Sequence, residues 1–187
     1  MRIFIFALLF WAPWSVAQQS VTTIFLVRHA EKASNADDSP LSPAGLKRAD
    51  CLAGMLKDAA IKEIFVTDAR RTQQTAEPLA KQLNIAPKIL PANDEANLVR
   101  NVLYAAGNSL VVGHSNTLPI VVARLHAGQI APIGENDYDK LYEITAVDGA
   151  ATPTVTLHYC PAAASPAPAG KAPAPTKAPS KKSPVKK

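Results

Sequence analysis

The chain has 187 residues, 48% of them hydrophobic, which is enough for one domain with a buried core. Its net charge of +5 comes from the two ends, because Arg2 and six lysines after residue 160 account for seven of the 20 basic side chains. The segment between them carries 13 basic and 15 acidic residues. This balance excludes a strongly basic domain surface, so we expect no nucleic-acid partner.

The first 17 residues have the pattern of a secretory signal. An apolar run at 3–11 follows one basic residue, and residues 15–17 are small where a signal peptidase cuts. The run is shorter than the roughly 20 residues that span a bilayer. We therefore expect cleavage after Ala17 and export, to the periplasm, with an uncleaved anchor as the alternative.

Residues 18–160 alternate between predicted strands and helices. A continuous apolar run at 22–28 predicts a strand buried on both faces. Ser42 and Pro43 predict a helix start, because the hydroxyl accepts from free N–H groups and proline needs no N–H partner there. The residues expected on the buried face of this helix are Leu46, Ala49, Leu52, Ala53 and Leu56. Further strands are expected near 62–67, 86–90, 109–113, 140–147 and 153–159, and helices near 70–83, 94–105 and 117–126.

This alternation predicts an α/β fold, a three-layer α/β/α sandwich with a mostly parallel central sheet. Ligands bind such sheets beyond the carboxyl ends of the strands. Arg28 and His29 follow the first strand, Arg71 follows the second, and His114 follows the strand at 109–113. Guanidinium groups match phosphate oxygens, and imidazole can act as a nucleophile or a donor. We expect these side chains to form one phosphate site that needs neither a metal nor a cofactor.

Three motifs in this order resemble the histidine phosphatase superfamily, in its phosphoglycerate-mutase-like branch. They are RHAEK at 28–32, RTQQTAEPLA at 71–80 and VVGHSNTLP at 111–119, and the resemblance spans about 22–160. It implies that His29 accepts the phosphoryl group and that Arg28 and Arg71 bind phosphate. His114 matches the second histidine of the family's pocket. The implied activity is a phosphomonoesterase with a phosphohistidine intermediate.

Other candidate site residues are less specific. Ser115 and Asn116 are expected at a helix start, where backbone N–H groups bind anions and the side chains cap or contact phosphate. Many family members donate a proton from a glutamate that has no clear match in LPANDEANL. Asp94 is our candidate, although Asp94 and Glu95 also suit the first turn of a helix. Glu31 is expected either to hold a pocket arginine or to be solvated.

The sequence lacks the motifs, with their residue spacing, that other enzyme classes require. Neither Cys51 nor Cys160 is followed by an arginine six positions on, and GxxxxGK[ST], GxSxG, HExxH and CxxC are absent from the sequence. Two alternatives stay open: a phosphoryl-transferring mutase and a non-catalytic anion-binding module of the envelope. The substrate class expected is a phosphorylated small molecule or envelope component.

The C-terminal segment and the two cysteines, Cys51 and Cys160, lead to two further predictions. Residues 161–187 are rich in proline, alanine and lysine without acidic or aromatic residues, which predicts a disordered tail that is solvated or attracted to anionic envelope polymers. Cys51 is expected on the exposed side of its helix, and Cys160 ends the last strand. Export permits a disulfide between them, and a free Cys160 is the alternative.

Overall fold

The computed structural model describes residues 20–160, so the predicted signal segment 1–17 and tail 161–187 lie outside the described residues. The strands are β1 (Val21–Arg28), β2 (Ile61–Thr67), β3 (Lys88–Leu90), β4 (Asn108–Gly113), β5 (Lys140–Val147), β6 (Ala150–Ala151) and β7 (Val155–His158). The helices are α1 (Pro43–Leu56), α2 (Arg70–Leu83), α3 (Glu95–Leu103) and α4 (Leu118–Arg124). Within this part of the chain, no helix is both long and apolar enough to span a bilayer.

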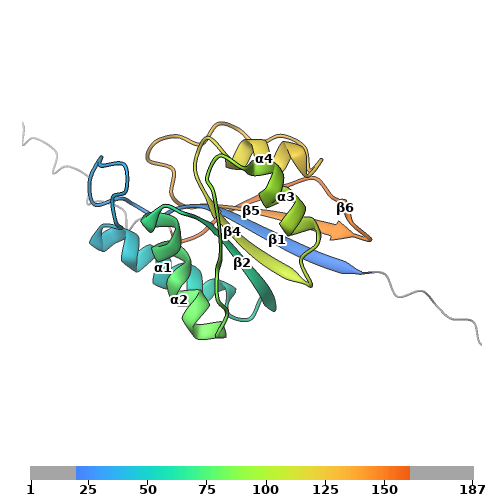
Figure 1. The fold of residues 1–187 in the computed structure, drawn as a ribbon, viewed down its shortest axis with the longest axis horizontal. Helices are drawn as coiled ribbons and strands as arrows, with labels where there is room; N and C mark the ends of the chain where they lie inside the picture. Colours follow the sequence, from blue (N-terminus) through green and yellow to red (C-terminus); the bar gives the residue numbers. More distant parts are fainter. Residues whose placement is uncertain (1–19, 161–187) are drawn as a thin grey trace, which may run out of the picture.

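The sheet lies between two helical layers, which confirms the predicted α/β fold. Helices α1 and α2 cover one face, and α3 and α4 cover the other (Figure 1). The strand order is β3-β2-β4-β1-β5-β6, and β7 also pairs with β5. The first four of these strands are parallel, whereas β5 runs antiparallel to β1, so the sheet is mixed.

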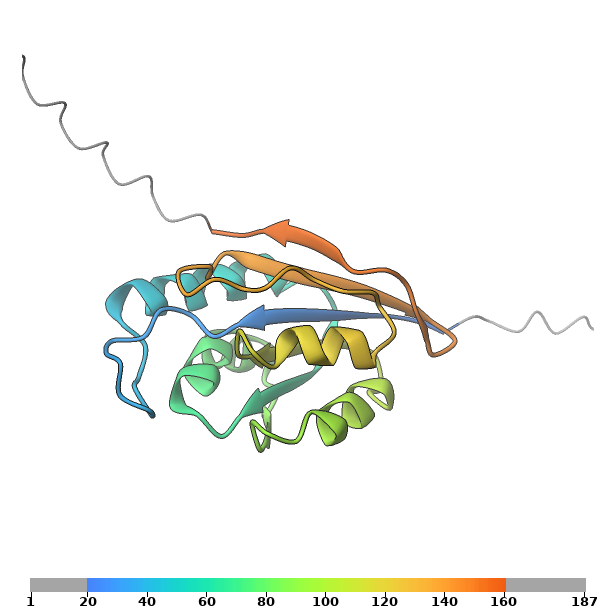
Figure 2. The same ribbon diagram turned by 90° about the horizontal axis from the view of Figure 1, so that it is seen from above.

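The antiparallel part of the sheet includes a short strand that the sequence pattern did not predict. Asp148 and Gly149 join β5 to β6 with positive φ angles of 51° and 80°, a geometry typical of a tight hairpin turn. Such a turn joins antiparallel strands, so β6 must run back along β5. Figure 2 shows β7 beside β5 at this edge of the sheet.

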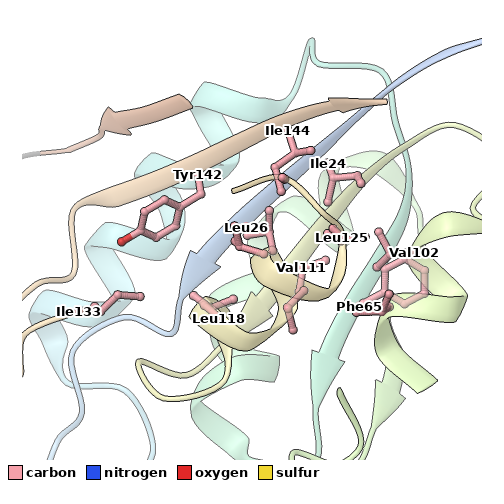
Figure 3. Packing of buried hydrophobic residues seen from close by; sticks show 14 residues of the cluster. Ile24, Leu26, Phe65, Val102, Val111, Leu118, Leu125, Ile133, Tyr142 and Ile144 are labelled. Atoms are coloured by element: carbon pink, nitrogen blue, oxygen red, sulfur yellow. The ribbon is translucent and has the colours of Figure 1, made fainter. Parts of the chain in front are cut away.

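Both faces of the central strands are buried. Along β1, Leu26 packs in the cluster beneath α3 and α4, and the next residue, Val27, packs beneath α1 and α2. This alternation follows from the two-residue period of a strand. Figure 3 shows Leu26 with Val111 and Leu118 in the first of these clusters. The continuous apolar run at 22–28 is therefore explained by two hydrophobic cores, one on each side of the sheet.

Helix α1 begins as predicted but buries a slightly different face. The Ser42 hydroxyl accepts a hydrogen bond from the Gly45 N–H at 3.1 Å. Leu46 was predicted to be buried, and this prediction is wrong because its exposed fraction is 48%. At about 100° per residue, Leu46 lies about a quarter turn from the centre of the stripe that α1 buries, which consists of Gly45, Arg48, Ala49, Leu52, Ala53 and Leu56. Arg48 is buried instead.

A disulfide joins Cys51 of α1 to Cys160, with their Cα atoms 6.3 Å apart. Cys51 lies on the exposed side of α1, as expected from its helical position. Its partner follows β7 at the end of the domain. The sequence left this bridge open, because only the packing of α1 against the sheet brings the two residues within range.

Candidate active site

The three predicted motifs meet at one edge of the sheet. Strands β2, β4 and β1 are parallel neighbours, with Arg28 paired to Gly113 and Val66 paired to Val112. Their carboxyl ends therefore open on the same side. The His29 N–H donates to the Gly113 carbonyl at 2.9 Å, which extends the β1–β4 pairing by one residue into the site.

The residues that follow these strands surround an open depression of about 440 Å³. The lining residues are Arg28, His29, Lys32, Arg71, Ala92, Asn93, Glu95, His114, Ser115, Asn116 and Thr117. Every predicted site residue except Asp94 and Glu31 is among them. The depression thus combines three cationic side chains and two imidazoles with a single carboxylate.

His29 is held as a neutral imidazole with one free nitrogen. Its Nδ1 lies 2.8 Å from the Ala30 carbonyl oxygen, which can only accept, so Nδ1 carries the proton and Nε2 keeps a lone pair. Burial lowers the pKa of His29 to about 3, and the nearby charges of Arg28 and Arg71 act in the same direction. At neutral pH, Nε2 is therefore available as a nucleophile.

Arg28 is anchored by the loop before β5. Its Nη1 donates to the carbonyl oxygens of Gly134 and Glu135 at 2.7 and 2.8 Å. Its guanidinium carbon lies 4.4 Å from the ring centroid of Tyr138. The buried Nε has no partner among the described residues. The guanidinium is thus fixed in place and retains capacity to donate to an anion.

Arg71 is anchored by the loop before α1. Its Nη1 donates to the Asp37 carbonyl at 2.7 Å, and Nη2 lies 3.3 Å from His114 Nδ1. In the described residues its buried Nε also lacks a partner. Loops before α1 and before β5 therefore hold the two arginines, and the sequence pattern did not reveal either contact.

His114 is oriented by neighbours on both nitrogens. Guanidinium groups only donate, so Arg71 Nη2 makes Nδ1 the acceptor, and Nε2, 3.0 Å from Thr67 Oγ1, carries the proton. Burial, and next the charge of Arg71, lowers the pKa of His114 to about 4, while Asp68 partly opposes this. The ring is uncharged at neutral pH, with Nδ1 on the side of Arg71.

The structure separates Asp94 from the site and brings in Glu95. Asp94 is the N-cap of α3, where its carboxylate accepts from the Asn97 N–H at 3.1 Å. It is absent from the residues that line the depression, whereas Glu95 is one of them. A helix that begins at Glu95 instead of at 94 accounts for the difference. Geometry therefore assigns capping to Asp94 and leaves Glu95 as the carboxylate that lines the depression.

Glu31 holds an arginine, but not a pocket arginine. Its carboxylate accepts from Arg48 Nε and Nη2 at 2.9 and 2.8 Å. Gly45 approaches the Glu31 backbone so closely that a Cβ there would lie 2.4 Å from the Glu31 carbonyl oxygen. Glu31 therefore joins the loop after β1 to α1. Arg70, the first residue of α2, is exposed, and its backbone N–H donates to the Asp38 carboxylate.

Three further placements concern the site. Ser115 and Asn116 lie in the turn between β4 and α4, and the Thr117 hydroxyl accepts from the His114 N–H at 3.2 Å. Lys32 was missed by the sequence reasoning, although its position three residues after His29 in RHAEK was a usable signal. Between residues 20 and 160, no group of three His, Cys, Asp or Glu side chains is arranged to hold a metal ion.

Comparisons with known proteins show which family this chain is similar to. A family model described as histidine phosphatase superfamily (branch 1) matches residues 24–102. The chain is 34% identical over 82 residues to a probable phosphoglycerate mutase GpmB of Yersinia enterocolitica, and 33% identical over 82 residues to that of Yersinia pestis. Each match covers 40% of this chain and only 38% of the relative. His114 lies beyond the family-model match.

Solved structures extend the likeness to most of the domain. The protein histidine phosphatase SixA, complexed with tungstate, superposes with a TM-score of 0.62 at 21% identity, over 73% of this chain and 97% of that one. A mycobacterial glucosyl-3-phosphoglycerate phosphatase superposes with a TM-score of 0.55 at 13% identity, over 75% and 99%. At these identities the likeness establishes the shared fold.

Proposed function

Because the chain belongs to the histidine phosphatase superfamily, we propose that it hydrolyses phosphate monoesters through a phosphohistidine intermediate on His29. One observation carries the proposal: a neutral histidine with a free Nε2 lies in the same depression as two arginines with unfilled donors. A dianionic phosphoryl group in the depression would accept hydrogen bonds from the two guanidinium groups and face the nucleophile. The curated relatives are matched over 38% of their length, so their activity supports the proposal only in part.

The proposed reaction has two displacements. His29 Nε2 attacks phosphorus, the bond from phosphorus to the leaving oxygen breaks, and that oxygen takes a proton from a carboxylic acid, assigned here to Glu95. Arg28, Arg71 and His114 stabilise the charge on the other phosphoryl oxygens. Water then attacks the phosphohistidine, the P–N bond breaks, and the carboxylate takes the proton from the water. Phosphate and neutral His29 are regenerated.

Hydrolysis is favoured over the mutase alternative by the size of the domain. A mutase must hold a second phosphorylated molecule, and the segment between Arg71 and His114 contains only the remainder of α2, then β3, α3 and β4. Of this segment, only Ala92, Asn93 and Glu95 line the depression, which leaves little of the chain to hold a second molecule. The non-catalytic alternative has less support because simple anion binding does not require a free imidazole nitrogen at the centre of the site.

We also propose that the protein acts in the bacterial envelope. The signal pattern at 1–17 supports export, and the Cys51–Cys160 disulfide suits an oxidising compartment. The substrate would then be a phosphorylated small molecule or envelope component. Fractionation of cells that express the full chain tests the location, and recovery of the uncleaved chain in the cytoplasm would contradict it.

The direct test is hydrolysis of p-nitrophenyl phosphate by the full chain in the presence of a chelator. We expect turnover, acid-labile phosphate on the protein during turnover, and loss of both in His29→Ala. His158→Ala is the matched control, because His158 is exposed and pairs with Asp139 away from the depression. Normal rates in His29→Ala would disprove the nucleophile. Tight phosphate binding without turnover would instead support the anion-binding module.

A further inference from the structure

Two buried threonine hydroxyls lie behind His114, and the proposed mechanism does not use them. Thr67 at the end of β2 and Thr72 in the first turn of α2 have exposed fractions of 6% and 0%. Their Oγ1 atoms are 2.9 Å apart, and Thr67 Oγ1 is 3.0 Å from His114 Nε2. These side-chain hydrogen bonds thus link the junction between β2 and α2 to the junction between β4 and α4.

The direction of each hydrogen bond follows from the groups at the two ends. Thr72 Oγ1 lies 2.7 Å from the Ala69 carbonyl oxygen and 3.0 Å from the Thr67 carbonyl oxygen, and because carbonyl oxygens can only accept, the Thr72 hydroxyl donates to the backbone. Thr72 Oγ1 is then an acceptor for the Thr67 hydroxyl. Thr67 Oγ1, having donated its proton to Thr72, accepts from His114 Nε2. The chain of donors therefore runs from the imidazole to the helix backbone.

We infer that Thr67, supported by Thr72, is a positioning residue that holds the proton of neutral His114 on Nε2 and directs Nδ1 towards the phosphoryl group. The inference deepens the proposed function and rests on it for the catalytic consequence. The opposite tautomer would place an N–H of His114 against the donating Nη2 of Arg71. It would also leave Thr67 Oγ1 without its imidazole donor.

The arrangement determines what happens when a dianion binds. The charged and titratable groups around His114 are Arg71 from α2, Arg28 from β1, Asp68 after β2 and His29. The arginines disfavour a second proton on the ring, and a phosphoryl dianion near Nδ1 reverses this balance. Arg71 Nη2 then donates to the phosphoryl group instead of to Nδ1, a proton taken up on Nδ1 donates to a phosphoryl oxygen, and Nε2–H stays bonded to Thr67. Without the Thr67 hydroxyl, the resulting imidazolium would have a buried donor with no partner.

The test combines kinetics with a direct measurement of the imidazole. Thr67→Val keeps the shape of the side chain and removes the hydroxyl, and Thr67→Ser keeps the hydroxyl. We expect kcat/KM for p-nitrophenyl phosphate to fall about 10- to 100-fold in Thr67→Val, as for loss of one hydrogen bond to a charged group. Thr67→Ser should restore most of this. Ser109→Ala is the control, because Ser109 has a buried hydroxyl without a partner among the described residues.

The tautomer itself is read from the ¹⁵N chemical shifts of His114 in the full chain, with and without inorganic phosphate. We expect protonated Nε2 in the wild type, a mixed tautomer in Thr67→Val, and a lower pKa of His114 in the phosphate complex of that variant. A wild-type His114 protonated on Nδ1 would overturn the inference, even if Thr67→Val failed to fold. Failure of Thr67→Ser to restore the tautomer would overturn it too. This measurement needs no turnover, so it separates failure of the inference from failure of the proposed function.

Discussion

Removal of the disulfide should cost a large part of the domain's stability. The perturbation is the double variant Cys51→Ser with Cys160→Ser, which leaves both side chains nearly the same size. The bridge joins residues 109 positions apart. In the chain-entropy treatment, a loop of this length restricts the unfolded state by about 5 kcal/mol. Because small domains have about 5–15 kcal/mol of stability in total, the loss should be plain in any unfolding experiment.

The bridge also supports a contact that leads to the site. Cys160 presents its carbonyl oxygen to Arg48 Nη1 at 2.7 Å, and the same guanidinium holds Glu31, two residues after His29. Release of Cys160 should therefore loosen the loop after β1 as well as the chain end. We expect phosphatase activity to be lost at lower urea concentrations than in the oxidised wild type.

Urea unfolding followed by circular dichroism measures the effect. Dithiothreitol should lower the stability of the wild type towards that of the double variant and leave the double variant unchanged, which separates the bridge from other effects of the reductant. Thiol titration of the unfolded, unreduced chain should find no free thiol. A double variant within about 1 kcal/mol of the oxidised wild type would refute the loop-closure reasoning.

Two further predictions concern the site. Glu95→Gln should lower kcat on alkyl phosphates about 10²- to 10⁴-fold because it removes the general acid, and the fall should be smaller on substrates with good leaving groups. Asp94→Asn should chiefly lower the stability of the domain, because Asp94 caps α3. Equal effects of the two variants on kcat would reject the assignment of Glu95 as the acid. Acid should destabilise the fold through His29 and His114, whose pKa values of about 3 and about 4 lie below the unfolded 6.5. Their contribution is full above pH 6.5 and is lost as pH falls towards 4, by about 1–2 kcal/mol per histidine between pH 7 and 5. His114→Asn should flatten this pH dependence, His158→Ala should not, and an unchanged slope in His114→Asn would contradict the reasoning.

Much of the fold could be predicted because its signals are local. The apolar run at 22–28 specifies a strand with two buried faces, and Ser42 with Pro43 specifies the start of α1. Antiparallel pairing of β5 and the short β6 escaped prediction. Their direction depends on which edge of the sheet receives the chain after α4, and no periodicity in the sequence records this choice.

The main site residues were predictable for a different reason. Parallel strands bring their carboxyl ends to one edge, so Arg28, His29, Arg71 and His114 could be grouped from their positions along the chain. The choice between Asp94 and Glu95 could not be made this way, because one residue in the start of α3 decides which carboxylate lines the depression.

The partners of polar side chains were decided only by the tertiary structure. Glu31 was expected beside a pocket arginine or in solvent, yet it binds Arg48 because α1 packs closely against the loop after β1. The bridge from Cys51 to Cys160 has the same origin. Strand and helix positions follow from patterns within a few residues. Contacts of a few ångströms between groups more than 100 residues apart, such as Arg48 and Cys160, depend on how whole elements pack.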